Sequence, residues 1–164
     1  MKQKFKDYYK KVVLQTAELS HAKRLKVGAI AVKNNRIIST GYNGTPAGWD
    51  NECERIWYPM DIEFEQDPED FQAEFSLIDD RGNRYQLITK QEVLHAEHNL
   101  IAKLAQSNES SKDAVMFCTV SPCIECAKLI QSAGIKKLYY IDNYRSNDGL
   151  EFLKKCNIEI EKLS

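Results

Sequence analysis

Two short stretches constrain this chain more than any other feature: His95-Ala96-Glu97 and Pro122-Cys123-Ile124-Glu125-Cys126. Imidazole and thiolate are ligands that zinc prefers, and a catalytic zinc site uses three of them so that water can take the fourth position. Cys123 and Cys126 are three residues apart, so both sulfurs lie on one face if the segment is helical. The sequence therefore predicts a zinc site built from this histidine and both cysteines, with Glu97 exchanging protons with the water.

The position of His95 relative to its helix decides whether Glu97 can reach the same water. Residues two apart on a regular helix point in roughly opposite directions, so we expect a helix that opens at His95 and runs to about Gln106. Thr89 and Glu92 form a capping-box pattern that instead predicts a helix from about residue 90. These two interpretations conflict, and the chemistry favours the first.

The second stretch carries its own signals for a helix start. Pro122 suits the first helical position, and Ser121 before it is a plausible N-cap. This arrangement would place both cysteines in the first turn, where the helix dipole favours thiolate over thiol.

The combination of H-x-E with P-C-x-x-C, in which the glutamate is not a ligand, is typical of zinc nucleobase deaminases. The alternative is a structural zinc site with a fourth ligand, for which Cys53, Cys118 and Cys156 are the candidates. Such a site has no use for Glu97, which favours the catalytic interpretation.

Composition narrows the class of partner. The 164 residues carry a formal net charge of −1, which argues against a broad basic surface for a nucleic acid polymer and favours a small substrate. The segment from Met1 to Lys11 is rich in lysine and tyrosine, so we expect no signal peptide, no membrane span and a cytoplasmic protein. Five cysteines, an odd number, do not suggest a disulfide framework.

Hydrophobic periodicity predicts strands that alternate with helices after an initial hairpin, hence an α/β fold with a mixed sheet. The turn of this hairpin is Lys33-Asn34-Asn35. Both helices of the zinc site should start from the same side of the sheet. The expected helices cover residues 4–19, 95–106, 123–132 and 147–155, and the expected strands cover residues 27–32, 36–40, 114–120, 137–141 and 158–160.

Residues 51–90 are the least regular part of the chain, and we interpret them as an insertion. They contain an acidic run over residues 61–74, expected to be a solvated face, and a second hairpin formed by residues 75–78 and 85–88. The loop before them, Gly41-Tyr42-Asn43-Gly44-Thr45-Pro46-Ala47-Gly48, has glycines that would let a ligand come close.

Taken together, the motifs make this chain similar to the deoxycytidylate deaminases of the zinc-dependent cytidine deaminase superfamily, of the kind common in phages and viruses. The resemblance covers nearly the whole chain except the insertion, and the loop from Gly41 to Gly48 narrows the substrate to dCMP. It implies a three-layer α/β/α cytidine deaminase-like fold with a mixed central sheet of about five strands, in a single deaminase domain, residues 1–164. The residues that carry it are 26–30, 36–48, 95–97 and 121–128.

The resemblance also implies an activity and a site. Hydrolytic deamination would convert dCMP to dUMP and ammonia and supply dUMP for dTMP synthesis, with zinc on His95, Cys123 and Cys126 and with Glu97 as the proton shuttle. The Ala96 amide would meet the ring carbonyl, Asn43 the deoxyribose hydroxyl and Tyr144 the base or phosphate. Thr45 and Ser121 complete the expected substrate-binding set. For Asn43 a simple turn, and for Tyr144 a surface aromatic, stay open.

Regulation is part of the same resemblance. The family is hexameric, activated by dCTP and inhibited by dTTP, with Mg²⁺ on the triphosphate, and Lys26 and Gly28 match the effector region. Solvent exposure explains a short basic cluster equally well. Only His21, Cys53 and His98 remain as spare zinc ligands, so a second zinc is not expected. Some relatives have an arginine where this chain has Gln106, so regulation is expected to differ.

Three alternatives remain open at the sequence level. The first is the same chemistry on dCTP, and the second is a polynucleotide deaminase acting on tRNA adenosine or single strands, which would want a basic groove with stacking aromatics. The third is a zinc-stapled binding module without catalysis.

Overall fold

The computed structural model describes residues 1–59 and 72–164. Its core is a five-stranded sheet in the order β2-β1-β6-β7-β8. The elements of the core are α1 (Gln3–Ala17), β1 (Gly28–Lys33), β2 (Arg36–Tyr42), α3 (Ala96–Ala105), β6 (Val115–Val120), α4 (Ile124–Ser132), β7 (Lys137–Asp142), α5 (Asp148–Lys155) and β8 (Glu159–Lys162).

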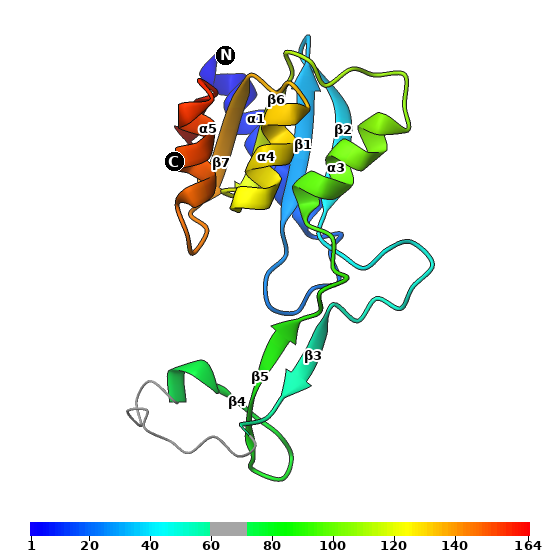
Figure 1. Cartoon of the computed structure of the whole chain (residues 1–164), viewed down its shortest axis with the longest axis vertical. Coiled ribbons are helices and arrows are strands. Elements are labelled where there is room, and N and C mark those ends of the chain that lie inside the picture. Colours follow the sequence, from blue (N-terminus) through cyan, green and yellow to red (C-terminus); the bar gives the residue numbers. More distant parts are fainter. Residues whose placement is uncertain (60–71) are drawn as a thin grey trace.

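The central sheet is mixed, as predicted. Strand β1 pairs antiparallel with both β2 and β6, whereas β6, β7 and β8 are parallel neighbours. Parallel neighbours need crossover connections, and α4 and α5 supply them. Since α4 and α5 follow the ends of parallel strands, they begin at one edge of the sheet, and α3 begins at the same edge (Figure 1).

Alternating side chains bury both faces of the sheet. In β1, Ala29 and Ala31 face the cluster that contains α3, α4 and α5, while Ile30 and Val32 face α1 together with Tyr9. Because Ala29 and Ala31 have small side chains, α3 can pack closely against this face of the sheet. Helices therefore cover both faces, which confirms the expected three layers; among the described residues, α1 is the helix that covers the second face (Figure 1).

The predicted initial hairpin is confirmed. Its turn is made by Asn34 and Asn35, whose φ angles of 51° and 58° are the left-handed values of a type I′ turn. The capping-box interpretation was wrong, because Thr89 is the last residue of a strand and pairs with Glu54. Helix α3 begins after His95 instead.

A second sheet stands apart from the core (Figure 1). It has the order β3-β5-β4, with β3 (Glu54–Trp57), β4 (Leu77–Ile78) and β5 (Arg84–Thr89). We call residues 51–59 and 72–92 the arm. The hairpin of β4 and β5 was predicted, whereas β3, which mixes charged and apolar residues, was not. The predicted acidic run lies mostly outside the described residues.

Within the described residues, no helix is both long and apolar enough to cross a membrane.

Candidate active site

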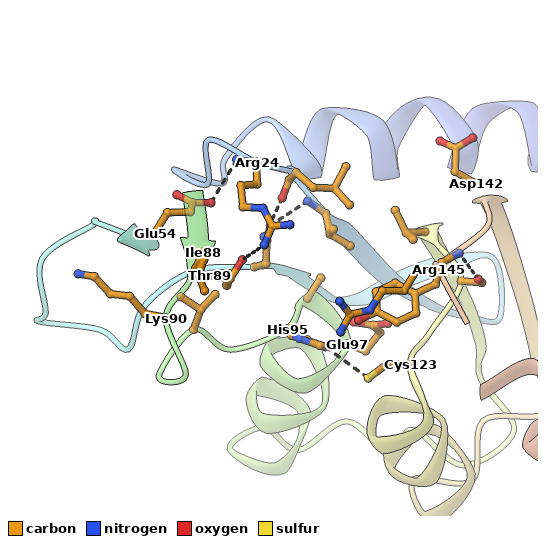
Figure 2. Close-up of a pocket in the computed structure, with 18 of the residues that line it drawn as sticks. Arg24, Glu54, Ile88, Thr89, Lys90, His95, Glu97, Cys123, Asp142 and Arg145 are labelled. Atoms are coloured by element: carbon orange, nitrogen blue, oxygen red, sulfur yellow. Dashed lines mark hydrogen bonds between the residues drawn. The ribbon is translucent and has the colours of Figure 1, made fainter. Parts of the chain in front are cut away.

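His95 and Glu97 lie at the start of α3. His95 is the N-cap residue, with the extended backbone angles φ −72° and ψ 156°, and Ala96 is the first helical residue. Side chains two residues apart point in roughly opposite directions only when both residues lie within a regular helix. Because His95 precedes the helix, its side chain and that of Glu97 can approach the same point, and Figure 2 shows His95, Glu97 and Cys123 close together. This confirms the predicted helix start.

The second stretch begins its helix later than predicted. Cys123 is the N-cap of α4, so only Cys126 lies in the first turn. Ser121 is not the N-cap, and Pro122 is not the first helical residue. The reason is tertiary: the hydroxyl of Ser121 accepts a hydrogen bond of 2.7 Å from the amide of Tyr144, in the loop after β7.

The three predicted ligands converge as a tetrahedral metal site requires. The Nδ1 atom of His95 lies 3.6 Å from Sγ of Cys123 and 3.3 Å from Sγ of Cys126. Zinc bonds of about 2.1 Å to nitrogen and about 2.3 Å to sulfur, at tetrahedral angles, place these atoms about 3.6 Å apart. In residues 1–59 and 72–164 this is the only such group, and Cys53, Cys118 and Cys156 do not join it. The residues therefore fit zinc with an open fourth position.

Ionisation in the site suits a metal and a proton shuttle. Hydrogen bonds from Cys126 and His95 lower the pKa of Cys123 to about 3, so its sulfur is a thiolate. The hydrogen bond with this thiolate is the main cause that raises the pKa of Cys126, and burial is the second cause. Without a metal, the two cysteines therefore share one proton, which zinc would displace on binding. Burial raises the pKa of Glu97, which is only 4% exposed, toward the range of a general acid and base.

Two glycines hold the ligand-bearing segments in place. A Cβ atom at Gly41 would lie 2.1 Å from the carbonyl oxygen of Ala96, and one at Gly149 would lie 2.1 Å from that of Pro122. Strand β2 and helix α5 therefore contact the two segments through bare backbone. No larger residue fits at these positions without displacing a segment of the site.

Two of the three ligands, His95 and Cys123, line a cavity of about 900 Å³ between the core and the base of the arm. Arg24 and Thr89 lie on one side of this cavity, and His95 and Cys123 lie on the other (Figure 2). The walls combine loop 24–27, the arm and the segments after β6 and β7. The site thus depends on parts of the chain that are distant in sequence.

Most of the predicted substrate residues line this cavity, namely Asn43, Ala96, Ser121 and Tyr144. Asn43 is not a simple turn residue: its side chain accepts from the amide of Val27 at 2.8 Å and donates to the carbonyl of Leu25 at 2.9 Å. Thr45 is placed elsewhere, since its hydroxyl donates to the carbonyl of Asp50 instead of facing the cavity.

The two predicted effector residues lie near the cavity but do not line it. The ammonium of Lys26 pairs with Glu18 at 3.0 Å on the surface. The amide of Gly28 donates to Oγ1 of Thr119 at 3.1 Å, and a Cβ there would lie 2.5 Å from the carbonyl oxygen of Val13. Gly28 thus has a packing role against α1.

Sequence reasoning missed the cations of the cavity, which are Arg24, Lys90 and Arg145. Arg24 lies two residues before Lys26, next to the predicted effector region, and Lys90 is the last residue of the segment interpreted as an insertion. Arg145 directly follows Tyr144, and its guanidinium lies 5.4 Å from the centre of the Tyr144 ring. That adjacency was the one local signal that could have identified it.

Comparison with known proteins agrees with this geometry. Residues 3–142 match the family model described as the cytidine and deoxycytidylate deaminase zinc-binding region. The chain belongs to this deaminase family. The chain is therefore a zinc-type deaminase, and its His-Cys-Cys group fits the zinc that this family binds.

Individual relatives include phage enzymes. The deoxycytidylate deaminase of Enterobacteria phage T4 is 37% identical over 154 residues, which cover 82% of this chain and 77% of that protein. The crystal structure of dCMP deaminase from cyanophage S-TIM5, in complex with dCMP and dUMP, is 38% identical with a TM-score of 0.78, and the match covers 99% of each chain. A solved tRNA:A34 deaminase is 19% identical with a TM-score of 0.54, over 95% of this chain and 91% of that one, and shares the fold.

Proposed function

We propose that this deaminase acts on dCMP and releases dUMP and ammonia, which would supply dUMP for dTMP synthesis. The observation that carries the proposal is that one cavity is lined by two of the zinc ligands, by Glu97 and by two arginines. The phage T4 relative, named a deoxycytidylate deaminase, and the S-TIM5 enzyme with dCMP and dUMP support the choice of substrate.

The chemistry at the ring follows from the residues at the start of α3. His95, Cys123 and Cys126 would hold zinc, which supplies a Lewis acid that makes water nucleophilic at neutral pH. Glu97 accepts one proton from this water and delivers it to the pyrimidine ring nitrogen as the water oxygen adds to the ring carbon that carries the amine. Glu97 then takes the second proton from the newly formed hydroxyl and passes it to the departing amine, which leaves as ammonia while the ring carbonyl of dUMP forms. The raised pKa of Glu97 suits both directions of transfer.

The base and the sugar would be held by backbone and amide groups. As the first residue of α3, Ala96 has no intrahelical acceptor for its amide, which can donate to the ring carbonyl. The side chain of Asn43 is fixed by loop 25–27 and can still offer its second amide hydrogen to the deoxyribose hydroxyl. Ser121 anchors Tyr144 beside the base.

Arg24 and Arg145 would bind the phosphate. Among the charged residues that line the cavity, Lys90 is paired with Asp50 at 3.6 Å, and Glu54 is engaged with backbone amides. Asp142 points away from the arginines in Figure 2. The two guanidinium groups thus provide the positive charge in the cavity, which favours a nucleotide over an uncharged nucleoside.

Further features of the proposal rest on the family resemblance. We propose a homo-hexamer regulated by dCTP and dTTP with Mg²⁺, in which Lys26 contacts the effector while Gly28 shapes the adjacent packing. We also propose that core and arm form one deaminase domain and that the enzyme works in the cytoplasm, the host cytoplasm if it is viral; the phage relatives support this location.

The test is a substrate panel on the purified zinc-loaded protein. We expect an ultraviolet absorbance change and ammonia release with dCMP, with less turnover of deoxycytidine, dCTP and a tRNA anticodon stem-loop. Glu97→Gln should retain zinc and lose turnover, which separates catalysis from a zinc-stapled binding module. Turnover of dCTP or tRNA, but not of dCMP, would overturn the substrate assignment, and assays with added dCTP, dTTP and Mg²⁺ would test the regulation.

A further inference from the structure

The arm holds Arg24 at both of its ends. At the backbone end, the carboxylate of Glu54 accepts from the amide of Arg24 at 3.2 Å and from that of Lys23 at 3.1 and 3.2 Å. At the side-chain end, Nη1 of the Arg24 guanidinium donates to Oγ1 of Thr89 at 3.3 Å. Figure 2 shows Arg24 between these two arm residues and the rest of the cavity.

The carboxylate of Glu54 is buried, and its hydrogen-bond donors are backbone amides. Glu54 is only 7% exposed, and the ion pairs of the described residues do not include it. A buried carboxylate without a cation is stabilised only by strong donors, and the amides of Lys23 and Arg24 are those donors. The position of loop 23–24 is therefore tied to the position of one carboxylate in β3.

The two residues that hold Arg24, Glu54 and Thr89, are paired neighbours in the sheet of the arm. Glu54 and Thr89 are directly opposite each other in the antiparallel pair of β3 and β5, so their side chains emerge on the same face at the base of the arm. Beside them, Ala22, Cys53 and Val93 form a small apolar cluster that joins loop 20–26 to the arm. The base of the arm is thus packed against, and hydrogen-bonded to, the segment that carries Arg24.

We propose that Glu54 and Thr89 are positioning residues for substrate binding, which act by aiming Arg24 at the phosphate of the nucleotide. This inference rests on the proposed function, in which Arg24 contacts that phosphate. It assigns the arm a role in nucleotide recognition: the core supplies the zinc and the acid, and the arm orients a cation that selects for a phosphorylated substrate.

The experiment is a double-mutant cycle on the zinc-loaded enzyme with dCMP. Loss of a charged hydrogen bond to phosphate in Arg24→Ala should raise KM about 10-fold to 100-fold. Glu54→Gln keeps one acceptor oxygen but loses the charge, and Thr89→Val removes the hydroxyl without changing shape. Both should raise KM several-fold and leave kcat and zinc content unchanged.

Non-additivity is the decisive readout. If Glu54 acts through Arg24, the double variant Arg24→Ala/Glu54→Gln should have the same kcat/KM as Arg24→Ala alone. The inference would be overturned if the effects of the two single substitutions on kcat/KM multiplied in the double variant. It would also be overturned if Glu54→Gln lowered kcat or zinc content and left KM unchanged. If Glu54→Gln does not fold, Thr89→Val tests the same role of the arm, because Thr89 lies at a more exposed position where a substitution disturbs the fold less.

A matched control lies two residues away. Glu52 is an exposed carboxylate whose contact is the ammonium of Lys23, at 3.1 Å on the surface, so Glu52→Gln should leave KM unchanged. A wild-type enzyme without activity on dCMP would refute the proposed function itself. An active wild type with additive variants would refute only the role of the arm.

Discussion

Gly149 is the residue where a single methyl group should disturb the zinc site from a distance. It lies in α5, which contributes no ligand, and it contacts the backbone that leads into Cys123. An added Cβ would lie 2.1 Å from the carbonyl oxygen of Pro122 and 2.9 Å from that of Cys123. Since carbon and oxygen atoms in contact normally lie about 3.3 Å apart, the two segments must separate by about 1 Å.

The magnitude follows from two opposing effects. Replacing glycine by alanine in a helix would stabilise α5 by at most about 1 kcal/mol. Overpacking against backbone that cannot rotate away costs about 1–3 kcal/mol, so we expect Gly149→Ala to lower the free energy of unfolding. A shift of about 1 Å in Cys123 should also reduce turnover about 100-fold.

The assay measures three quantities on the same preparations: thermal unfolding, zinc content and ammonia release from dCMP. Gly44→Ala is the matched control, because a Cβ there meets nothing within 4 Å, and it should keep stability and zinc. A Gly149→Ala protein with a higher melting temperature, full zinc content and full activity would refute the idea that α5 positions Cys123 by close contact.

Three further predictions follow from other parts of the molecule. Cys126→Ser should lose zinc, and its melting temperature should no longer respond to added zinc or chelator, in contrast to the wild type. Leu100→Ala removes a fully buried side chain of the main core and should cost about 2–5 kcal/mol in chemical denaturation. The amide of Asn83 and other donors lower the pKa of Asp79. The ionised Asp79 carboxylate should therefore stabilise the turn between β4 and β5 at any pH above the ordinary carboxyl pKa, and this stabilisation should be lost as the pH falls through the lowered pKa of Asp79. Carboxyl NMR titration should show this, and Asp79→Asn should abolish the pH dependence of the turn.

Local chemistry explains which parts of the site could be predicted. The motifs at His95 and Cys123 predict zinc, because ligand type and spacing are properties of a few neighbouring residues. The start of α3 at His95 also followed, since the geometry of a shared water excludes a continuous helix through Glu97. The start of α4 did not, because the side chain that would have capped it, Ser121, binds Tyr144 instead.

The sequence by itself determined the alternation of strands and helices, the mixed character of the sheet, the three zinc ligands and the acid beside them. Each of these is encoded by residue types over short distances. Only the tertiary structure decided that Arg24 faces the zinc ligands across a cavity and that the arm holds it through Glu54 and Thr89. These contacts join residues 30 and 65 positions apart, and no local pattern records which backbone amides a buried carboxylate will meet.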